Sequence, residues 1–323
     1  MIRTVAFAIL FASSTALPAA ETKPLAIPNL PEAFSSFGAT TLEGYVYVYG
    51  GHAGKTHSYA NETTLGRFRR LKIDAPEKGW EELTAGTHLQ GLALVGYKQS
   101  VIRIGGMEPR NSKSEKADNN STATVQRFDV KTQKWSDLPE LPAGRSSHDA
   151  VVVADTLVVV GGWNMKGAGG KNEWHTTALT LDLADAKAEW KILEQPFGRR
   201  ALTAAVHEGK VFVIGGMNAE AGMDNSVNVL DAKTGKWTDG PKVPGDKMNA
   251  FSPAACSLDG KVYLNPSDGK IYRMNGEKWD EVSAIKTPRK VHRMVPLAGG
   301  RMLVLGGATS EGSVGSGEVV GTK

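Results

Sequence analysis

Leu157-Val158-Val159-Val160-Gly161-Gly162 is an apolar run that stops at a pair of glycines. Valine-rich runs of this length are typical of buried β-strands, and a glycine pair indicates a sharp backbone change that other residues tolerate poorly. The same sequence pattern recurs at 46–51, 101–106, 211–216 and 302–307. Copies spread over the whole chain predict a fold built from repeated units rather than two unrelated domains.

The copies are evenly spaced. The glycine pairs begin 55, 56 and 54 residues apart at Gly50, Gly105, Gly161 and Gly215. The next pair begins 91 residues later at Gly306, which leaves room for one further copy. We place that copy at 261–265, where Asn265-Pro266 stands in place of the glycines. The count is therefore six repeats.

A tryptophan follows five of these copies by 14 to 30 residues, at Trp80, Trp135, Trp190, Trp237 and Trp279. A period near 50 with a glycine pair and a downstream tryptophan resembles the kelch repeat, which forms one four-stranded blade of a β-propeller. The resemblance implies an all-β, six-bladed kelch-type propeller over residues 21–323.

The sixth repeat runs out of sequence after its third predicted strand, near 318–321. Residues 24–27 are followed by Pro28-Asn29-Leu30-Pro31, which looks like the link that follows an outer strand elsewhere in the chain. An open ring would leave strand edges without partners. We therefore expect an N-terminal strand to complete the last blade and close the ring.

Residues 1–20 have the composition of a secretory signal peptide. Arg3 precedes an apolar stretch that begins at Val5, and small residues follow up to Ala20. The stretch is short for a membrane-spanning helix, and no second candidate follows it. We expect a soluble monomer without a membrane span, located in the periplasm or secreted.

The net charge of +4 favours anionic ligands only slightly, and nucleic-acid binding would require clustered lysine and arginine. The single cysteine, Cys256, excludes an intrachain disulfide and is predicted to be a small buried side chain. Neither a His-x₃-His motif nor a cysteine cluster is present, so we expect no metal and no cofactor. Histidines from different blades could nevertheless converge on the axis.

Strands alternate in direction within a blade. Links between blades therefore emerge on the same face as the loops between second and third strands, and the remaining turns lie on the opposite face. Six of the seven histidines fall on the first face. The loops contain His52, His57 and His175, the links contain or directly precede His88, His148 and His292, and only His207 lies opposite.

Arginines repeat in the links between blades. Arg145, Arg199 and Arg289 each follow a proline closely, and a histidine follows the first and the last by three residues. Arginine binds carboxylates through paired hydrogen bonds, and aromatic rings stack on the rings of sugars. The candidate ligand-binding residues are Arg145, Arg199, Arg200, Arg289, His52, His88, Trp163 and Trp174. The alternative is that the three repeated arginines make structural hydrogen bonds between blades.

The exported six-repeat layout resembles the bacterial N-acetylneuraminate epimerases, kelch proteins that interconvert sialic acid anomers. The resemblance implies a general acid and base near the sugar ring, for which His148, His292 and Glu173 are the candidates. Two functions stay open: binding of a small anionic sugar, a glycan or a protein partner on this face, or catalysis as a sugar mutarotase. Binding is favoured because kelch propellers bind more often than they catalyse.

Overall fold

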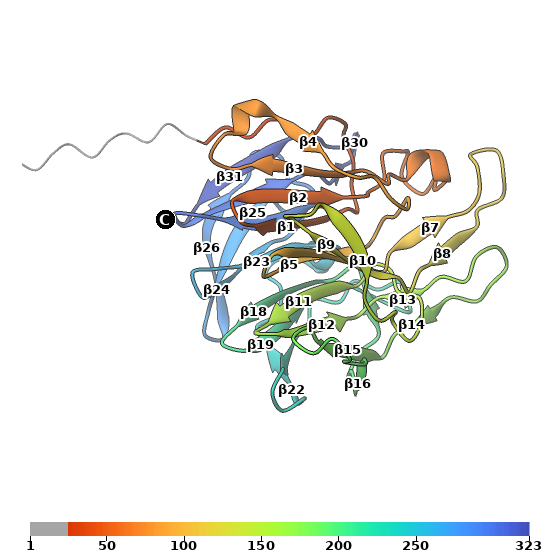
Figure 1. The fold of residues 1–323 in the computed structure, drawn as a ribbon. Coiled ribbons are helices and arrows are strands. Elements are labelled where there is room, and N and C mark those ends of the chain that lie inside the picture. The colour runs from red at the N-terminus through yellow and green to blue at the C-terminus, as the bar shows by residue number, and fades with distance from the viewer. Residues whose placement is uncertain (1–24, 323) are drawn as a thin grey trace, which may run out of the picture.

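The computed structural model describes residues 25–322, so the predicted signal peptide lies outside the described residues. Six antiparallel sheets follow one another along the chain, and each is one blade (Figure 1). The predicted all-β, six-bladed propeller is thus confirmed. The helices within this part of the chain are three short 3₁₀ turns, η1 (Asn61–Thr63), η2 (Pro76–Lys78) and η3 (Lys247–Ala250). None of them is long and apolar enough to cross a membrane.

The first three blades have four strands each. Blade one contains β1 (Gly38–Leu42), β2 (Tyr45–Tyr49), β3 (Phe68–Lys72) and β4 (Trp80–Glu82). Blade two contains β5 (Ala93–Tyr97), β6 (Ser100–Ile104), β9 (Val125–Asp129) and β10 (Lys134–Asp137). Blade three contains β11 (Asp149–Val153), β12 (Thr156–Val160), β15 (Thr177–Asp182) and β16 (Lys191–Glu194).

The other three blades complete the ring. Blade four contains β18 (Thr203–His207), β19 (Lys210–Ile214), β21 (Val227–Asp231) and β22 (Trp237–Gly240). Blade five contains β23 (Ala254–Leu258), β24 (Lys261–Asn265), β25 (Lys270–Asn275) and β26 (Lys278–Ala284). Blade six contains β27 (Arg293–Leu297), β28 (Arg301–Leu305) and β31 (Gly317–Gly321).

Short strand pairs lie in the loops and links of one face. They are β7 (Met107–Pro109) with β8 (Asn119–Ser121), β13 (Trp163–Asn164) with β14 (Glu173–Trp174), β17 (Arg199–Arg200) with β20 (Met217–Asn218), and β29 (Ala308–Thr309) with β30 (Gly312–Ser313). The first two pairs project together on the right of Figure 1. This face therefore carries all four short strand pairs of the described residues.

The glycine pair after β12 shows why the repeat needs glycine. Gly161 and Gly162 have φ angles of 68° and 88°, and a Cβ on Gly161 would lie 2.3 Å from Leu202 of the next blade. The amide of Gly162 donates to the carbonyl of Arg199 at 2.8 Å, also across the blade boundary. The glycines thus let neighbouring blades approach closely enough to share a backbone hydrogen bond.

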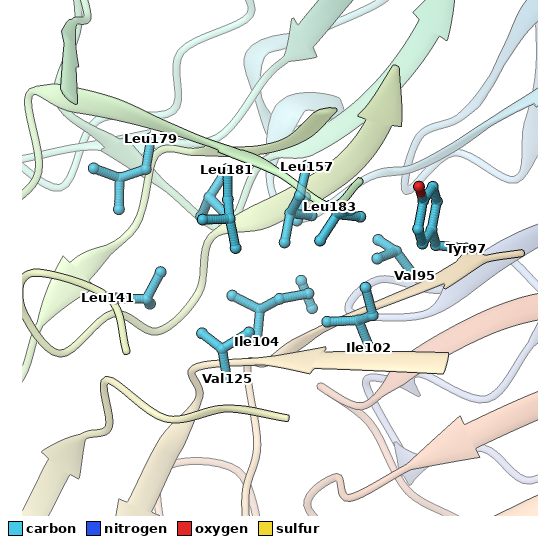
Figure 2. Packing of buried hydrophobic residues seen from close by; sticks show 13 residues of the cluster. Val95, Tyr97, Ile102, Ile104, Val125, Leu141, Leu157, Leu179, Leu181 and Leu183 are labelled. Atoms are coloured by element: carbon cyan, nitrogen blue, oxygen red, sulfur yellow. The ribbon is translucent and has the colours of Figure 1, made fainter. Parts of the chain in front are cut away.

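The apolar core lies between neighbouring blades. Figure 2 shows Ile102 and Ile104 of blade two near Leu157, Leu179 and Leu181 of blade three, in one buried cluster. Several repeat tryptophans tie their blade to an earlier link. Their indole N–H groups donate to the carbonyl oxygens of Pro28, Pro139, Glu194 and Pro241, from Trp80, Trp190, Trp237 and Trp279 respectively.

The last blade has three strands among residues 25–322, and the N-terminal segment lies against it. Leu25 and Ile27 pack on a cluster that includes Leu303 and Leu305, and the amide of Leu30 donates to Gly315 at 2.8 Å. The described part of this segment makes its contact through side chains and that backbone bond rather than through strand pairing.

Candidate functional site

Each link between blades contains one residue with left-handed backbone, and we call these six residues the axial ring. They are Ser36, Gly91, Ser147, Ala201, Ser252 and Val291, with φ between 48° and 59°. Each amide donates to the carbonyl of the ring residue in the preceding blade, and Ser36 closes the circle by donating to Val291. The N–O distances run from 2.6 to 3.3 Å. The propeller axis is therefore encircled by a closed set of six backbone hydrogen bonds.

A cavity of about 300 Å³ lies against the axial ring, and all six ring residues line it. The hydroxyl groups of Ser36, Ser147 and Ser252 have no hydrogen-bond partner among the described residues, and they alternate around the ring with Gly91, Ala201 and Val291. The remaining lining is divided between apolar and polar side chains. The aromatic and thioether side chains are Tyr59, Met107, Trp163, Met165, Met217 and Phe251, and the polar or charged ones are His57, Gln90, His148, Arg200, His292 and Arg293. The cavity therefore combines free hydroxyl groups with apolar surface.

The loops of the first three blades form a continuous wall on one side of the cavity. The amide of Asn61 in blade one donates to Asn111 of blade two at 3.0 Å. The amide of Ser121 in blade two donates to Met165 of blade three at 2.8 Å. Because loops are usually the mobile part of a fold, this cross-bonding supplies the order that a binding wall requires.

Arg200 places a cation in this wall. Its guanidinium carbon lies 4.2 Å from the centre of the Trp163 ring and 5.6 Å from that of Trp174, and Nη2 donates to the sulfur of Met217 at 3.1 Å. Burial lowers the pKa of Arg200, and nearby Tyr59 opposes the shift. Among the described residues, no aspartate or glutamate lines the cavity. The charge of Arg200 is thus held by stacking and left available to an anion.

His148 and His292 also line the cavity, and the structure brings them together there as predicted from the sequence. Both are buried, and their ring nitrogens make no hydrogen bond of good geometry in the described structure, although the imidazole of His148 lies near the backbone of Ile104. Burial, aided by nearby arginines, lowers the pKa of His148 well below its usual value and that of His292 to about 3. Each neutral imidazole therefore offers one donor and one acceptor.

Further polar atoms beside the cavity lack partners. They are Nε2 of Gln90, Nε1 of Trp163 and Nε of Arg200. Buried polar groups in proteins are almost always paired, so these atoms are candidates for hydrogen bonds to a ligand, although other unpaired atoms, such as Nε of Arg145 and of Arg199, lie away from the cavity. The sequence reasoning missed Gln90, because it belongs to no repeated motif. Only an alignment of the six links, in which Gln90 directly precedes a ring residue, could have identified it.

Arg145, Arg199 and Arg289 are placed differently. All three are buried, and none lines the cavity. Arg145 donates to the carbonyls of Gly161 and Thr177, both at 2.9 Å, and Arg199 donates to the carbonyl of Ser226 at 2.8 Å. Their guanidinium groups thus donate to carbonyl oxygens at the end of the second strand or the start of the third strand in their own blade. An anion in the cavity would not meet them.

Arg289 repeats this arrangement in the last blade. It donates to the carbonyls of Gly306 and Ser316 at 3.2 and 2.9 Å, and it pairs with the carboxylate of Glu318. The hydrogen bonds lie within the blade, whereas the sequence alternative placed them between blades. The bond between blades is made by the backbone instead, as in the donation from Gly106 to the carbonyl of Arg145.

The other candidates lie in the loops around the cavity rather than in its lining. Glu173 is exposed and pairs with Lys166, at a distance of 2.5 Å between oxygen and nitrogen. Nε2 of His52 lies 3.0 Å from the carbonyl of Lys55, and Nδ1 of His88 lies 3.0 Å from the carbonyl of Asn61. The ring of Trp174 lies 5.7 Å from that of Trp163, between the ring centres. Of the predicted set, the cavity lining contains Arg200, Trp163, His148 and His292.

Within residues 25–322, no three histidine, cysteine, aspartate or glutamate side chains gather as a metal ion would require. Cys256 lies opposite Tyr263 in the register of β23 and β24, inside an apolar cluster. Burial raises the pKa of the Cys256 thiol to about 12, so it remains a protonated core side chain.

The sequence matches the KLHDC2/KLHL20/DRC7 Kelch-repeats domain over residues 91–307. It is 30% identical to Kelch-like protein 40 of Xenopus laevis over 75% of this chain and 39% of that protein. It is 26% identical to acyl-CoA-binding domain-containing protein 4 of Arabidopsis thaliana over 72% of this chain and 34% of that protein. The chain thus spans well under half of either relative.

The fold is similar to the solved structure of YjhT, with a TM-score of 0.74 and 18% sequence identity. The match covers 92% of this chain and 97% of the other. At this identity the likeness concerns the fold alone. Together with the matched repeats, the six blades and their glycine pairs place this chain in the kelch-repeat β-propeller family.

Proposed function

We propose that this protein binds a small anionic sugar, or the anionic end of a glycan, in the axial cavity. The observation that carries the proposal is Arg200, whose cation stacks on Trp163 in a wall without carboxylates. A carboxylate can pair with such a guanidinium through two parallel hydrogen bonds. The aromatic rings beside it offer the flat apolar surface on which a sugar ring stacks.

The rest of the lining supports a hydroxyl-rich ligand. The serine hydroxyls of the axial ring, the amide of Gln90 and the neutral imidazoles of His148 and His292 can donate and accept hydrogen bonds. A purely apolar ligand would leave these groups without partners, at a cost of about 1–3 kcal/mol for each buried group. Arg293 also lines the cavity, but its guanidinium is paired with Asp149, so Arg200 is the cation left for a ligand. The cavity therefore suits a ligand with many oxygens and one negative charge.

The test is a thermal-shift panel on the mature protein with N-acetylneuraminate, glucuronate, glucose and N-acetylmannosamine. We expect the two acids to stabilise the protein and the neutral sugars to do so less, since a ligand at 100 times its Kd adds about 2.7 kcal/mol. Arg200→Met should weaken binding of the acids by about tenfold to a hundredfold, because a charge-assisted hydrogen bond contributes about 1.5–3 kcal/mol.

Arg301→Met is the matched control, because Arg301 begins β28 on the opposite face and does not line the cavity. It should bind the acids as the wild-type protein does. Equal binding of acids and neutral sugars, or an Arg200→Met variant that binds like the control, would show that the cavity does not select anions through Arg200.

A sugar mutarotase is the second candidate, favoured by the partnerless nitrogens of His148 and His292 beside the cavity. Neutral imidazoles could pass a proton to the ring oxygen and take one from the anomeric hydroxyl. Exchange spectroscopy on N-acetylneuraminate anomers would separate the candidates. Accelerated exchange that His292→Gln abolishes while binding persists supports catalysis, and binding without acceleration supports a binding protein.

Export to the periplasm or the medium remains part of the proposal, because residues 1–20 have the composition of a signal peptide. Fractionation of a tagged full-length chain would test it. A protein partner on the same face is the competing ligand class, and it predicts that loop substitutions outside the cavity alter binding more than Arg200→Met does.

A further inference from the structure

We propose that Val291 determines ligand specificity at the axial ring, by presenting an apolar side chain that the backbone holds in a strained conformation. The proposal rests on the proposed function, because it concerns the ligand of the same cavity. It adds a requirement on the ligand's shape. The side of the ligand that faces blade six must be apolar, such as a methyl group or the C–H face of a ring.

The backbone of Val291 is the first observation. Thirteen residues other than glycine have positive φ in the described chain, and Val291, at 50°, is the only β-branched one. A left-handed backbone brings Cβ close to the following carbonyl oxygen, and a second branch at Cβ aggravates the crowding. Strain of this kind persists where the surrounding structure imposes it, and it gathers at functional sites.

The position of Val291 in the axial ring is the second observation. The five other members are serine, glycine or alanine, which are the smallest residues. The amide of Val291 makes the longest bond of the circle, 3.3 Å to the carbonyl of Ser252, whereas Gly91 makes the shortest, 2.6 Å to Ser36. The largest side chain of the ring therefore coincides with the longest hydrogen bond of the circle.

The surroundings of Val291 suggest what its side chain contacts. It lines the cavity and is only partly buried, so its methyl groups are not needed to fill a core. Its neighbours in the ring, Ser36 and Ser252, are serines that line the same cavity. The isopropyl group of Val291 makes the cavity wall between these two serines apolar. A ligand hydroxyl placed against it would lose its hydrogen bonds to water without gaining others.

Two substitutions test this role. Val291→Gly removes the side chain and relieves the backbone, so the melting temperature should rise by about 2–4 °C. Binding of N-acetylneuraminate and glucuronate, titrated calorimetrically, should weaken by about tenfold, because two buried methyl groups are lost. Val291→Thr keeps the shape and the branch but exchanges one methyl for a hydroxyl. It should also weaken binding while leaving the melting temperature close to that of the wild type.

The matched control is Ala154→Gly. Ala154 has φ 52° and lies in the turn between β11 and β12 on the opposite face. This substitution should raise the melting temperature through the same relief of strain and leave both acids bound as in the wild type.

Three outcomes would overturn the proposal. If Val291→Gly and Val291→Thr bind both acids as tightly as wild type, Val291 does not contact the ligand, although the proposed function stands. If Val291→Gly melts lower than wild type while Ala154→Gly melts higher, the conformation of Val291 stores no strain. If the wild-type protein binds neither acid, the proposed function and this inference fall together.

Discussion

The guanidinium of Arg293 in blade six reaches the carboxylate of Asp149 in blade three, with Nη1 and Oδ1 3.4 Å apart. The same guanidinium donates to the carbonyl of Phe37 in blade one at 2.8 Å and to that of Leu92 in blade two at 3.0 Å. Oδ2 of Asp149 accepts a hydrogen bond from the amide of Ala204 in blade four at 2.9 Å. One ion pair thus joins five blades across the axis.

Arg293→Met should therefore lower stability strongly, because it removes the cation paired with the largely buried Asp149 carboxylate and the donor to two carbonyl oxygens. Breaking such a pair costs about 3–5 kcal/mol when it is buried, and because Arg293 is partly exposed we expect a loss of about 3 kcal/mol. Urea unfolding measures it. Lys72→Met, which breaks the exposed pair of Lys72 with Asp74, is the control and should cost less than about 1 kcal/mol. Equal losses in the two variants would show that the axial pair is not a structural brace.

Arg289→Ala should destabilise the fold and leave ligand affinity within about twofold, because Arg289 anchors the start of β31 and does not line the cavity. The loss should reach several kcal/mol, since Glu318 and two carbonyls lose a buried cation. Arg289→Lys should recover only part of the stability, because lysine cannot reproduce the planar fork. Melting temperature and affinity must be measured on the same variant. If the variant is as stable as the wild type but binds the ligand more weakly, Arg289 belongs to the binding site and the prediction is wrong.

Stability should fall when the pH drops below about 6.5. Burial lowers the pKa of His292 to about 3 and that of His148 well below its usual value, so the unfolded chain binds protons that the folded chain does not. Above pH 6.5 each such histidine is neutral in both states and the free energy of unfolding is at its full value. For each histidine, the free energy of unfolding then declines by about 1.4 kcal/mol per pH unit as the pH falls toward the pKa of the folded state.

Urea unfolding of the apo protein at pH 7 and pH 5 tests this dependence. His292→Leu should flatten the difference between the two conditions, and His207→Leu on the opposite face serves as the control. A wild-type protein equally stable at both values would mean that these imidazoles are protonated in the folded state.

Ile27→Asp should lower the melting temperature by several degrees, because the side chain of Ile27 packs with the cluster at blade six. A carboxylate there would be buried without a partner. Glu43→Asp, in the exposed turn between β1 and β2, is the control. If both variants melt with the wild type, the N-terminal segment does not close the ring.

The repeated strands and glycine pairs determined the fold from the sequence, because they depend on local chemistry. An apolar run followed by two glycines specifies a buried strand and a close approach between blades wherever it occurs, as at Val160-Gly161-Gly162. The face assignment also followed from strand alternation alone. The face assigned in this way contains Arg200, Trp163, His148 and His292, which line one cavity.

Only the tertiary structure decided which side chains of that face reach the axis. Arg199 and Arg200 are adjacent in sequence, yet one is turned into its own blade and the other lines the cavity. Residues on a strand-like segment point in alternate directions, so a shift of one position exchanges inside for outside. The left-handed backbone of Ala201, the residue after Arg200, and its hydrogen bond to Ser147 of the neighbouring link set this register, and that bond exists only once blades three and four have packed together.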